Sequence, residues 1–399
     1  MKLRKGALDN LVLIAGAILF FWLLTLPKFS GVVTHYQDSL RYASSTLKGE
    51  MPFSDFASMI VGFRALYNRT EPYPVLGVAF KDLGIDWPVT HGSNYPPTCY
   101  LFAAPVAFFN WPVASALWAW LMLCLLVLSY RFYGLSWRMA LGLMPFTLLW
   151  VPASASLGQA TIIWVFGLAL AYRFRGKELL WSGASIGLAS ISKYMPGLMM
   201  ILFLLKRKWR AIAGFVAVWV LALTVVVLMN PAAIPRYFEE NRTTSFFLMQ
   251  RTDNTAPLIA SFRHGGIIGV GLLLLLFAAI IFVNRRYFYD WKTFPSMRAW
   301  MLVTYFSVVI LPIFFIYSLM PLLPVIIYLL SERKIATTLI SIYCLLISSI
   351  YIQGGEQSVL PIASVSIFTG LAFVLDQLPL KIFQQRWLVT AGDKKAAAA

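Results

Sequence analysis

The chain has 399 residues, of which 60% are hydrophobic and only 12% are charged, whereas soluble domains usually carry about 25% charged residues. Apolar runs long enough to cross a bilayer recur along the whole length, which excludes a soluble globular protein. They predict an all-α polytopic membrane protein. The formal net charge of +17 would favour a nucleic-acid partner only if it were gathered on a soluble surface.

The first apolar run, residues 11–26, is too long for the core of a cleavable signal peptide and follows a basic start. We therefore expect a cytoplasmic N-terminus and a membrane span there. Residues 1–395 are expected to form one transmembrane domain with a cytoplasmic C-terminus, and residues 396–399 a tail remnant. About twelve crossings are predicted, at 11–26, 113–130, 140–151, 161–172, 180–191, 195–205, 211–229, 267–283, 299–316, 321–330, 335–351 and 360–375.

This layout places the charges unequally on the two sides of the membrane. The inner side carries 22 Lys+Arg against 6 Asp+Glu, and the outer side carries 11 Lys+Arg against 10 Asp+Glu. Nearly all of the excess positive charge is inside, as the positive-inside rule requires. We therefore expect a multi-pass cell (inner) membrane protein and no nucleic-acid partner.

Two large loops are predicted on the outer side, at residues 30–97 and 230–264. The first holds six of the sixteen acidic residues of the chain. Within it, residues 55–67 are expected to form a surface helix, because apolar side chains recur at helical spacing. The apolar piece 98–109 is too short to span and is interpreted as shallow or re-entrant. The apolar positions of the surface helix are Phe56, Met59, Ile60 and Phe63.

Polar residues of the outer side supply the candidate chemistry. Lys193 lies between two short spans, and Arg263 precedes another span. Two cations at the membrane boundary suit a lipid phosphate, because both side chains donate charge-assisted hydrogen bonds. A carboxylate nearby suits proton abstraction from a hydroxyl. Asp55 and Asp38, both in the first predicted outer loop, are the candidate bases.

Structural interpretations of the same residues stay open at this point. Asp55 could cap the helix that follows it. Lys193 could extend to the outer headgroups, and Arg263 could anchor the interface. The three cysteines and three histidines lack the spacing of a disulfide framework or a metal site, so we expect no metal and no cofactor.

Four motifs follow one another along the chain: Asp55-Phe56, Tyr95-Pro96-Pro97, Gly158-Gln159 with Lys193 and Pro196, and Asn254 with Leu258 and Arg263. Their order and spacing resemble the polyprenol-phosphate-sugar-dependent glycosyltransferases of family 87, in the C-type superfamily. Two positions depart from the family's pattern. Its serine is Ala256 here, and its late Ser-Pro motif with tryptophan and histidine reads Leu311-Pro312 with Phe315 and Tyr317.

The resemblance implies a C-type bundle of about twelve transmembrane helices with surface helices in its first outer loop. It implies inverting transfer of mannose or another hexose or pentose from a polyprenyl-monophosphate donor to an outer-leaflet lipid or glycan. By its position in the motif, Asp55 would be the general base, with Asp38 as its rival. Lys193 and Arg263 would bind the donor phosphate. Substrate contacts are expected from Tyr95, Gln159, Asn254, Tyr73, Trp87 and Tyr317.

Two other functions remain as alternatives. A lipid-linked glycan flippase or transporter would also have many spans, but internal repeats and charges buried mid-span are typical of it. A glycan polymerase or ligase would also act on lipid-linked substrates outside the cell. The largest outer loop here is acidic, which favours the glycosyltransferase.

Overall fold

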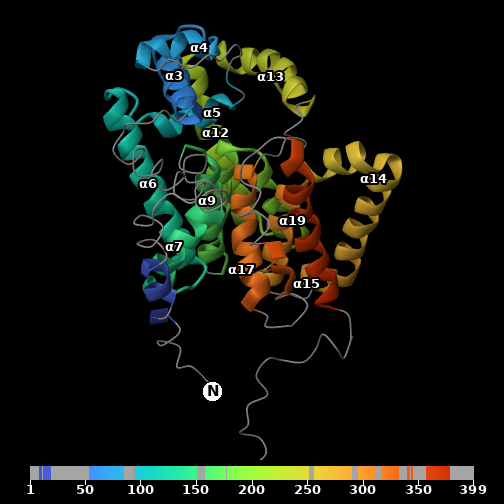
Figure 1. Ribbon diagram of the computed structural model, residues 1–399. Coiled ribbons are helices and arrows are strands. Elements are labelled where there is room, and N and C mark those ends of the chain that lie inside the picture. The colour runs from blue at the N-terminus through green and yellow to red at the C-terminus, as the bar shows by residue number, and fades with distance from the viewer. Residues whose placement is uncertain are drawn as a thin grey trace, which may run out of the picture.

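The computed structural model describes residues 9–10, 12–18, 54–84, 93, 95–150, 158–176, 178–250, 256–289, 295–310, 316–331, 339–341, 343–344 and 356–377. Every regular element within these ranges is helical (Figure 1). The longer helices are α3 (Ser54–Asn68), α6 (Trp111–Phe132), α7 (Trp137–Trp150), α9 (Thr161–Phe174), α10 (Leu179–Ser192), α12 (Trp209–Met229), α13 (Ala233–Gln250), α14 (Pro257–Asn284), α16 (Met297–Val309), α17 (Leu323–Ser331) and α19 (Glu356–Leu375). The shorter ones are α4 (Leu76–Ala79), η1 (Lys81–Leu83), α5 (Pro97–Tyr100), η2 (Leu101–Ala103), η3 (Met195–Met199), α11 (Met200–Leu205), α15 (Arg286–Tyr289) and η4 (Ile316–Leu322).

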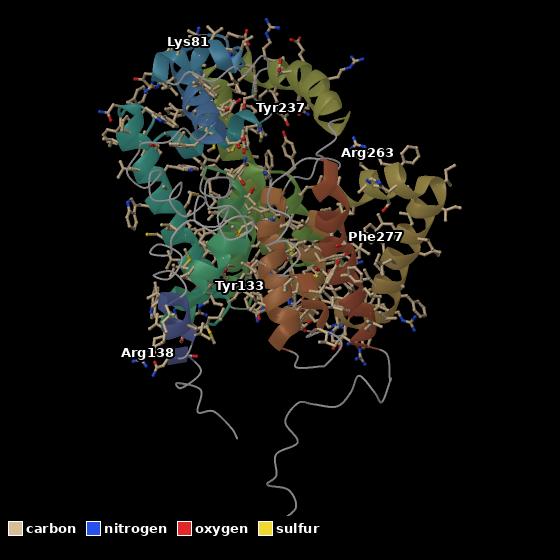
Figure 2. The ribbon with its side chains drawn as sticks, in the orientation of Figure 1. Lys81, Tyr133, Arg138, Tyr237, Arg263 and Phe277 are labelled. Carbon is tan, nitrogen blue, oxygen red and sulfur yellow. The ribbon has the colours of Figure 1, made fainter. Side chains whose placement is uncertain are left out.

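The long helices stand side by side, and α3, α4 and α13 form a cap at one end of them (Figure 1). Basic segments that were predicted to share the cytoplasmic side lie at the opposite end, where Figure 2 labels Arg138. Arg138 donates to Asn10 Oδ1 over 2.6 Å, and Lys206 Nζ donates to the Tyr289 carbonyl of α15 over 2.5 Å. Each of these contacts joins two segments that were predicted to lie on the same side.

Three helices of the described residues are long and apolar enough to cross a membrane by length and composition: α6, α12 and α14. The sequence had predicted a span within each. Most of the shorter apolar helices begin and end within a few residues of other predicted spans, as α9 and α10 do at 161–172 and 180–191. Helix α16 ends at Val309, before the predicted end of its span at 316. Local signals fix such ends: Asn110 caps α6 by accepting from the Val113 amide over 3.2 Å, with Pro112 in the first turn.

Helices α10 and α12 pack with almost no space between their backbones. An added Cβ at Gly183 would lie 1.7 Å from the Ala211 carbonyl oxygen, and one at Gly214 would lie 2.0 Å from the Leu180 carbonyl oxygen. Small residues allow such close approach between helices in membranes. This contact fixes the register of α10, which carries Lys193 at its end.

The segments predicted to lie outside differ from the sequence interpretation in two respects and agree with it in a third. Helix α3 is buried on nearly all sides rather than lying on a surface with one polar face, since every residue from Phe56 to Phe63 is buried. Because α3 begins at Ser54, Asp55 lies within its first turn and is not its N-cap. The piece 98–109 is divided among α5, η2 and turns, in keeping with the short non-spanning segment predicted there.

The second outer loop is largely helical. Residues 233–250 form α13, and α14 begins at Pro257, so Arg263 lies within a helix rather than before one. Gly266 interrupts α14 with φ 55° and ψ −146°, a backbone conformation that favours glycine. The predicted span 267–283 therefore matches the part of α14 that follows this kink.

Candidate active site

Helix α10 ends well before its neighbour α12 on the side of the cap. The two helices run in the same direction, since Gly183 packs on Ala211 and Trp219 Nε1 donates to Ser190 Oγ over 2.7 Å. Helix α10 ends two residues after Ser190, whereas α12 continues ten residues past Trp219 to Met229. The end of α10 therefore forms a step about 12 Å below the end of α12.

Helix α5 covers this step and brings α3 to it. Thr98 Oγ1 donates to the Ile191 carbonyl over 2.8 Å, which seats α5 on the last turn of α10. At the end of α12, Asn230 Nδ2 donates to the Thr70 carbonyl over 2.9 Å, which ties down the chain that leaves α3. These contacts place the first turn of α3, with Asp55, beside the step.

The half-buried Asp55 carboxylate is joined to two buried polar side chains. Gln159 Nε2 donates to Asp55 Oδ2, and the Tyr95 hydroxyl donates to Gln159 Oε1 over 2.5 Å. Gln159 lies two residues before the start of α9 and is 1% exposed, and Tyr95 lies two residues before the start of α5 and is 6% exposed. Three motifs that are far apart in the sequence thus meet in one hydrogen-bonded chain.

Lys193 supplies positive charge beside Asp55. It ends α10 with an extended backbone, and Pro196 then starts η3, so the side chain leaves at the step. Its Nζ donates to Thr161 Oγ1 over 3.2 Å. Burial lowers the pKa of the Lys193 ammonium group, and the nearby Asp55 carboxylate acts against this shift. A lysine held in this way can bind an anion more strongly than a solvated one can.

Three aromatic side chains adjoin these two charges: Tyr73, Tyr194 and Tyr237. We call this cluster the tyrosine wall. The Tyr73 hydroxyl donates to the Tyr95 carbonyl over 3.0 Å, and the Tyr73 ring lies 6.0 Å from that of Tyr237 on α13. Tyr194 is next to Lys193 in the chain, and its ring centroid lies 6.2 Å from that of Tyr237. Tyr194 is 45% exposed, so the wall offers an accessible ring next to the cation.

Arg263 is placed apart from this group. It is exposed on the first part of α14, at the same end of the molecule as the cap (Figure 2). Helix α14 packs mainly on α19, whereas Asp55 and Lys193 come from helices that pack on α5 and α12. The structure therefore brings together Asp55 and Lys193, and it leaves Arg263 on a different part of the same end of the molecule.

Several predicted site residues lie outside the described part of the chain. Tyr317 falls in η4, but its side chain is not among those described. The rival base and two expected substrate contacts also lie outside: Asp38, Trp87 and Asn254.

Sequence reasoning missed four side chains of this site: Thr161, Cys99, Tyr194 and Tyr237. Tyr194 and Thr161 carried a usable signal, because each lies within two residues of a predicted site residue. Tyr237 carried none, because its segment was interpreted as a loop. Within the described ranges, no group of three His, Cys, Asp or Glu side chains could hold a metal ion.

A protein-family model, glycosyltransferase family 87, matches residues 94–312, which is more than half of the chain. The chain belongs to glycosyltransferase family 87. No curated protein and no solved structure matches it. The matched segment includes Tyr95, Gln159, Lys193 and Arg263, whereas Asp55 lies before its first residue.

Membership in family 87, together with the long apolar helices, makes this protein a glycosyltransferase of the membrane. The resemblance stated from the motifs is thereby confirmed at the level of the family. The hydrogen bond from Gln159 links the matched segment directly to Asp55.

Proposed function

We propose that this family 87 protein transfers a sugar from a polyprenyl-monophosphate donor to a hydroxyl of an outer-leaflet lipid or glycan, with inversion at the anomeric carbon. One observation carries the proposal: a carboxylate and a lysine ammonium group lie together at the capped end of an apolar bundle. The carboxylate suits a base, and the lysine suits a phosphate. The cap end is assigned to the extracytoplasmic side because the basic segments gather at the other end.

In the proposed reaction, Asp55 takes up the proton that is released and Lys193 faces the charge that develops on the phosphate. Asp55 accepts the proton of the acceptor hydroxyl while the acceptor oxygen forms a bond to the anomeric carbon. The bond between the anomeric carbon and the phosphate oxygen breaks, and its electron pair stays with the polyprenyl phosphate. The donor diester carries one negative charge and the leaving monoester gains a second, so Lys193 stabilises charge that develops during transfer.

The tyrosine wall gives this site a surface for the sugar. Aromatic rings have an apolar face, and tyrosine adds a hydroxyl that forms hydrogen bonds. The exposed ring of Tyr194 adjoins Lys193, where the phosphate would be bound. Arg263, from the other part of the outer end, is proposed as a second phosphate ligand.

The class of donor can be tested with purified protein in liposomes. Product is expected with a short-chain polyprenyl-phosphate sugar and an acceptor glycolipid. No product is expected with the matching nucleotide sugar. Transfer from the nucleotide sugar at a similar rate would contradict the proposal.

Replacement of Lys193 by methionine is expected to lower kcat/KM for the donor about ten- to a hundredfold, because a charged hydrogen bond to the phosphate contributes about 1.5–3 kcal/mol. Most of the loss is expected in kcat, because the charge that Lys193 stabilises grows in the transition state. Steady-state kinetics with varied donor concentration measure both terms. Lys81→Met, at an exposed position of the cap, is the matched control and should have wild-type kinetics.

The pH dependence of donor binding provides a second readout for Lys193. Since burial lowers the pKa of this lysine, its charge is lost at a lower pH than that of an exposed lysine. KM for the donor should therefore rise on the alkaline side, and Lys193→Arg, if active, should move that rise to higher pH. An alkaline limb that is the same in both proteins would remove Lys193 from phosphate binding.

A further inference from the structure

The hydrogen bonds that run from Tyr95 through Gln159 to Asp55 have a single possible direction when the carboxylate is ionised. A carboxylate can only accept, so the Gln159 amide must turn its NH2 group toward Asp55. Its carbonyl oxygen then faces Tyr95, and the phenol must donate to it. Both donors in the chain therefore point toward the negative charge, which makes the charged form of Asp55 more favourable.

The members of this chain are also held in place from outside it. The Tyr95 amide donates to Ser93 Oγ over 3.3 Å, and the Tyr95 carbonyl accepts from the Tyr73 hydroxyl over 3.0 Å. Two prolines follow Tyr95 and restrict the backbone further. Gln159 lies two residues before the first residue of α9, so the start of a helix sets its position. These contacts leave the Gln159 side-chain amide few other orientations.

Burial separates these two residues from a substrate. Gln159 is 1% exposed and Tyr95 is 6% exposed, and their polar ends bond to each other. Direct contact with a sugar would require the chain to break. This geometry gives them a different task from the substrate contact that the sequence had led us to expect.

We propose that Gln159 and Tyr95 are positioning residues that keep the Asp55 carboxylate ionised and oriented toward the acceptor hydroxyl. The inference rests on the proposed function, in which Asp55 is the general base. Neither residue touches the reacting atoms. Gln159 acts on Asp55 directly, and Tyr95 acts through Gln159.

Two further titratable groups face Asp55 and set the background for any pH measurement. Lys193, at the end of α10, favours the ionised carboxylate, and Cys99, on α5, is a neighbour of both. Burial raises the pKa of the Cys99 thiol, so Cys99 stays neutral at physiological pH. The variants below leave Lys193 and Cys99 unchanged, so that a shift can be assigned to the hydrogen-bonded chain.

The test is the pH profile of kcat in Gln159→Leu and Tyr95→Phe, measured with saturating donor and acceptor. Loss of the amide donor makes the charged carboxylate less favourable, so the acidic limb should move to higher pH in Gln159→Leu, with kcat about ten- to a hundredfold lower at neutral pH. Tyr95→Phe should produce the same change to a smaller degree, because Gln159 remains. KM for both substrates should change less than threefold.

Gln159→Glu provides a variant of nearly unchanged size. Once ionised, a second carboxylate would repel Asp55 and disfavour its ionised form, so the acidic limb should lie at a still higher pH than in Gln159→Leu. Tyr305→Phe is the matched control: it removes another buried tyrosine hydroxyl, which donates to the Ser366 carbonyl over 3.0 Å on other helices. It should leave the pH profile unchanged.

Three outcomes would overturn the inference. A large increase in KM with an unmoved acidic limb would mean that Gln159 contacts a substrate. Loss of activity together with a lower melting temperature and an unmoved limb would mean a structural role only. Wild-type activity in Asp55→Asn would instead refute the base assignment, which distinguishes failure of the proposed function from failure of this inference.

Discussion

Asp55→Asn is expected to reduce kcat at least a hundredfold while leaving the protein folded and able to bind the donor. Asparagine has almost the same shape and can still bond to Gln159, but it cannot accept the proton of the acceptor hydroxyl. General base catalysis typically contributes about 10²–10⁴-fold, and this contribution should be lost almost completely. The measurement is single-turnover transfer at saturating donor, with melting temperature as the check on folding.

Two controls make this result specific. Asp82→Asn changes an exposed carboxylate of η1 in the same cap and should retain full activity. Asp38→Asn tests the rival base, which lies outside the described residues. Activity that survives in Asp55→Asn and disappears in Asp38→Asn would move the site to the beginning of the first outer loop.

Removal of either partner of the buried Arg298–Asp376 ion pair should cause the largest loss of stability in this chain. The Arg298 guanidinium lies where α14, α16 and α19 meet. It donates to Asp376 Oδ2, to Asn284 Oδ1 over 2.7 Å, and to the Phe373 carbonyl over 3.1 Å. Both charged side chains are 5% exposed or less. Removal of one partner of such a pair leaves a buried charge uncompensated and costs about 3–5 kcal/mol.

We therefore expect Asp376→Leu to lower the apparent melting temperature in detergent by on the order of 5–10 °C. The double variant Arg298→Met with Asp376→Leu should recover much of the loss, because it leaves no unpaired charge. Arg236→Met is the matched control. Arg236 pairs with Glu239 over 2.8 Å at the surface, and its removal should change the melting temperature little. Equal shifts in Asp376→Leu and Arg236→Met would contradict this account.

The helical framework was predictable because local signals mark it. Apolar length predicted α6, α12 and most of α14, and the Asn110-Trp111-Pro112 break marked the start of α6. Helix α13 was missed because polar residues are spread along an amphipathic segment that no apolar run marks. The interruption of α14 at Gly266 is a positive φ at a single residue, which hydrophobic periodicity does not report.

The sequence predicted the residues of the candidate site, but it did not predict the hydrogen bonds between them. Lys193 was selected because a cation at membrane depth is expensive to keep there without a function. Asp55 and Gln159 were selected because they lie in motifs that resemble those of family 87. The contact of Gln159 with Asp55 joins residues 104 positions apart, and Tyr95 contacts Gln159 across 64 positions. The packing of α5 on α10 brings these distant residues together. No pattern in one sequence encodes them.

The most direct test of the central claim follows a polyprenyl-phosphate sugar, labelled at the anomeric carbon, in liposomes that contain the wild-type protein and an acceptor glycolipid. The account predicts that the donor is consumed and that NMR shows a new glycosidic bond of the opposite anomeric configuration. Intact donor that has moved between leaflets would identify a flippase and contradict the account. A product with retained configuration would contradict the single displacement assigned to Asp55.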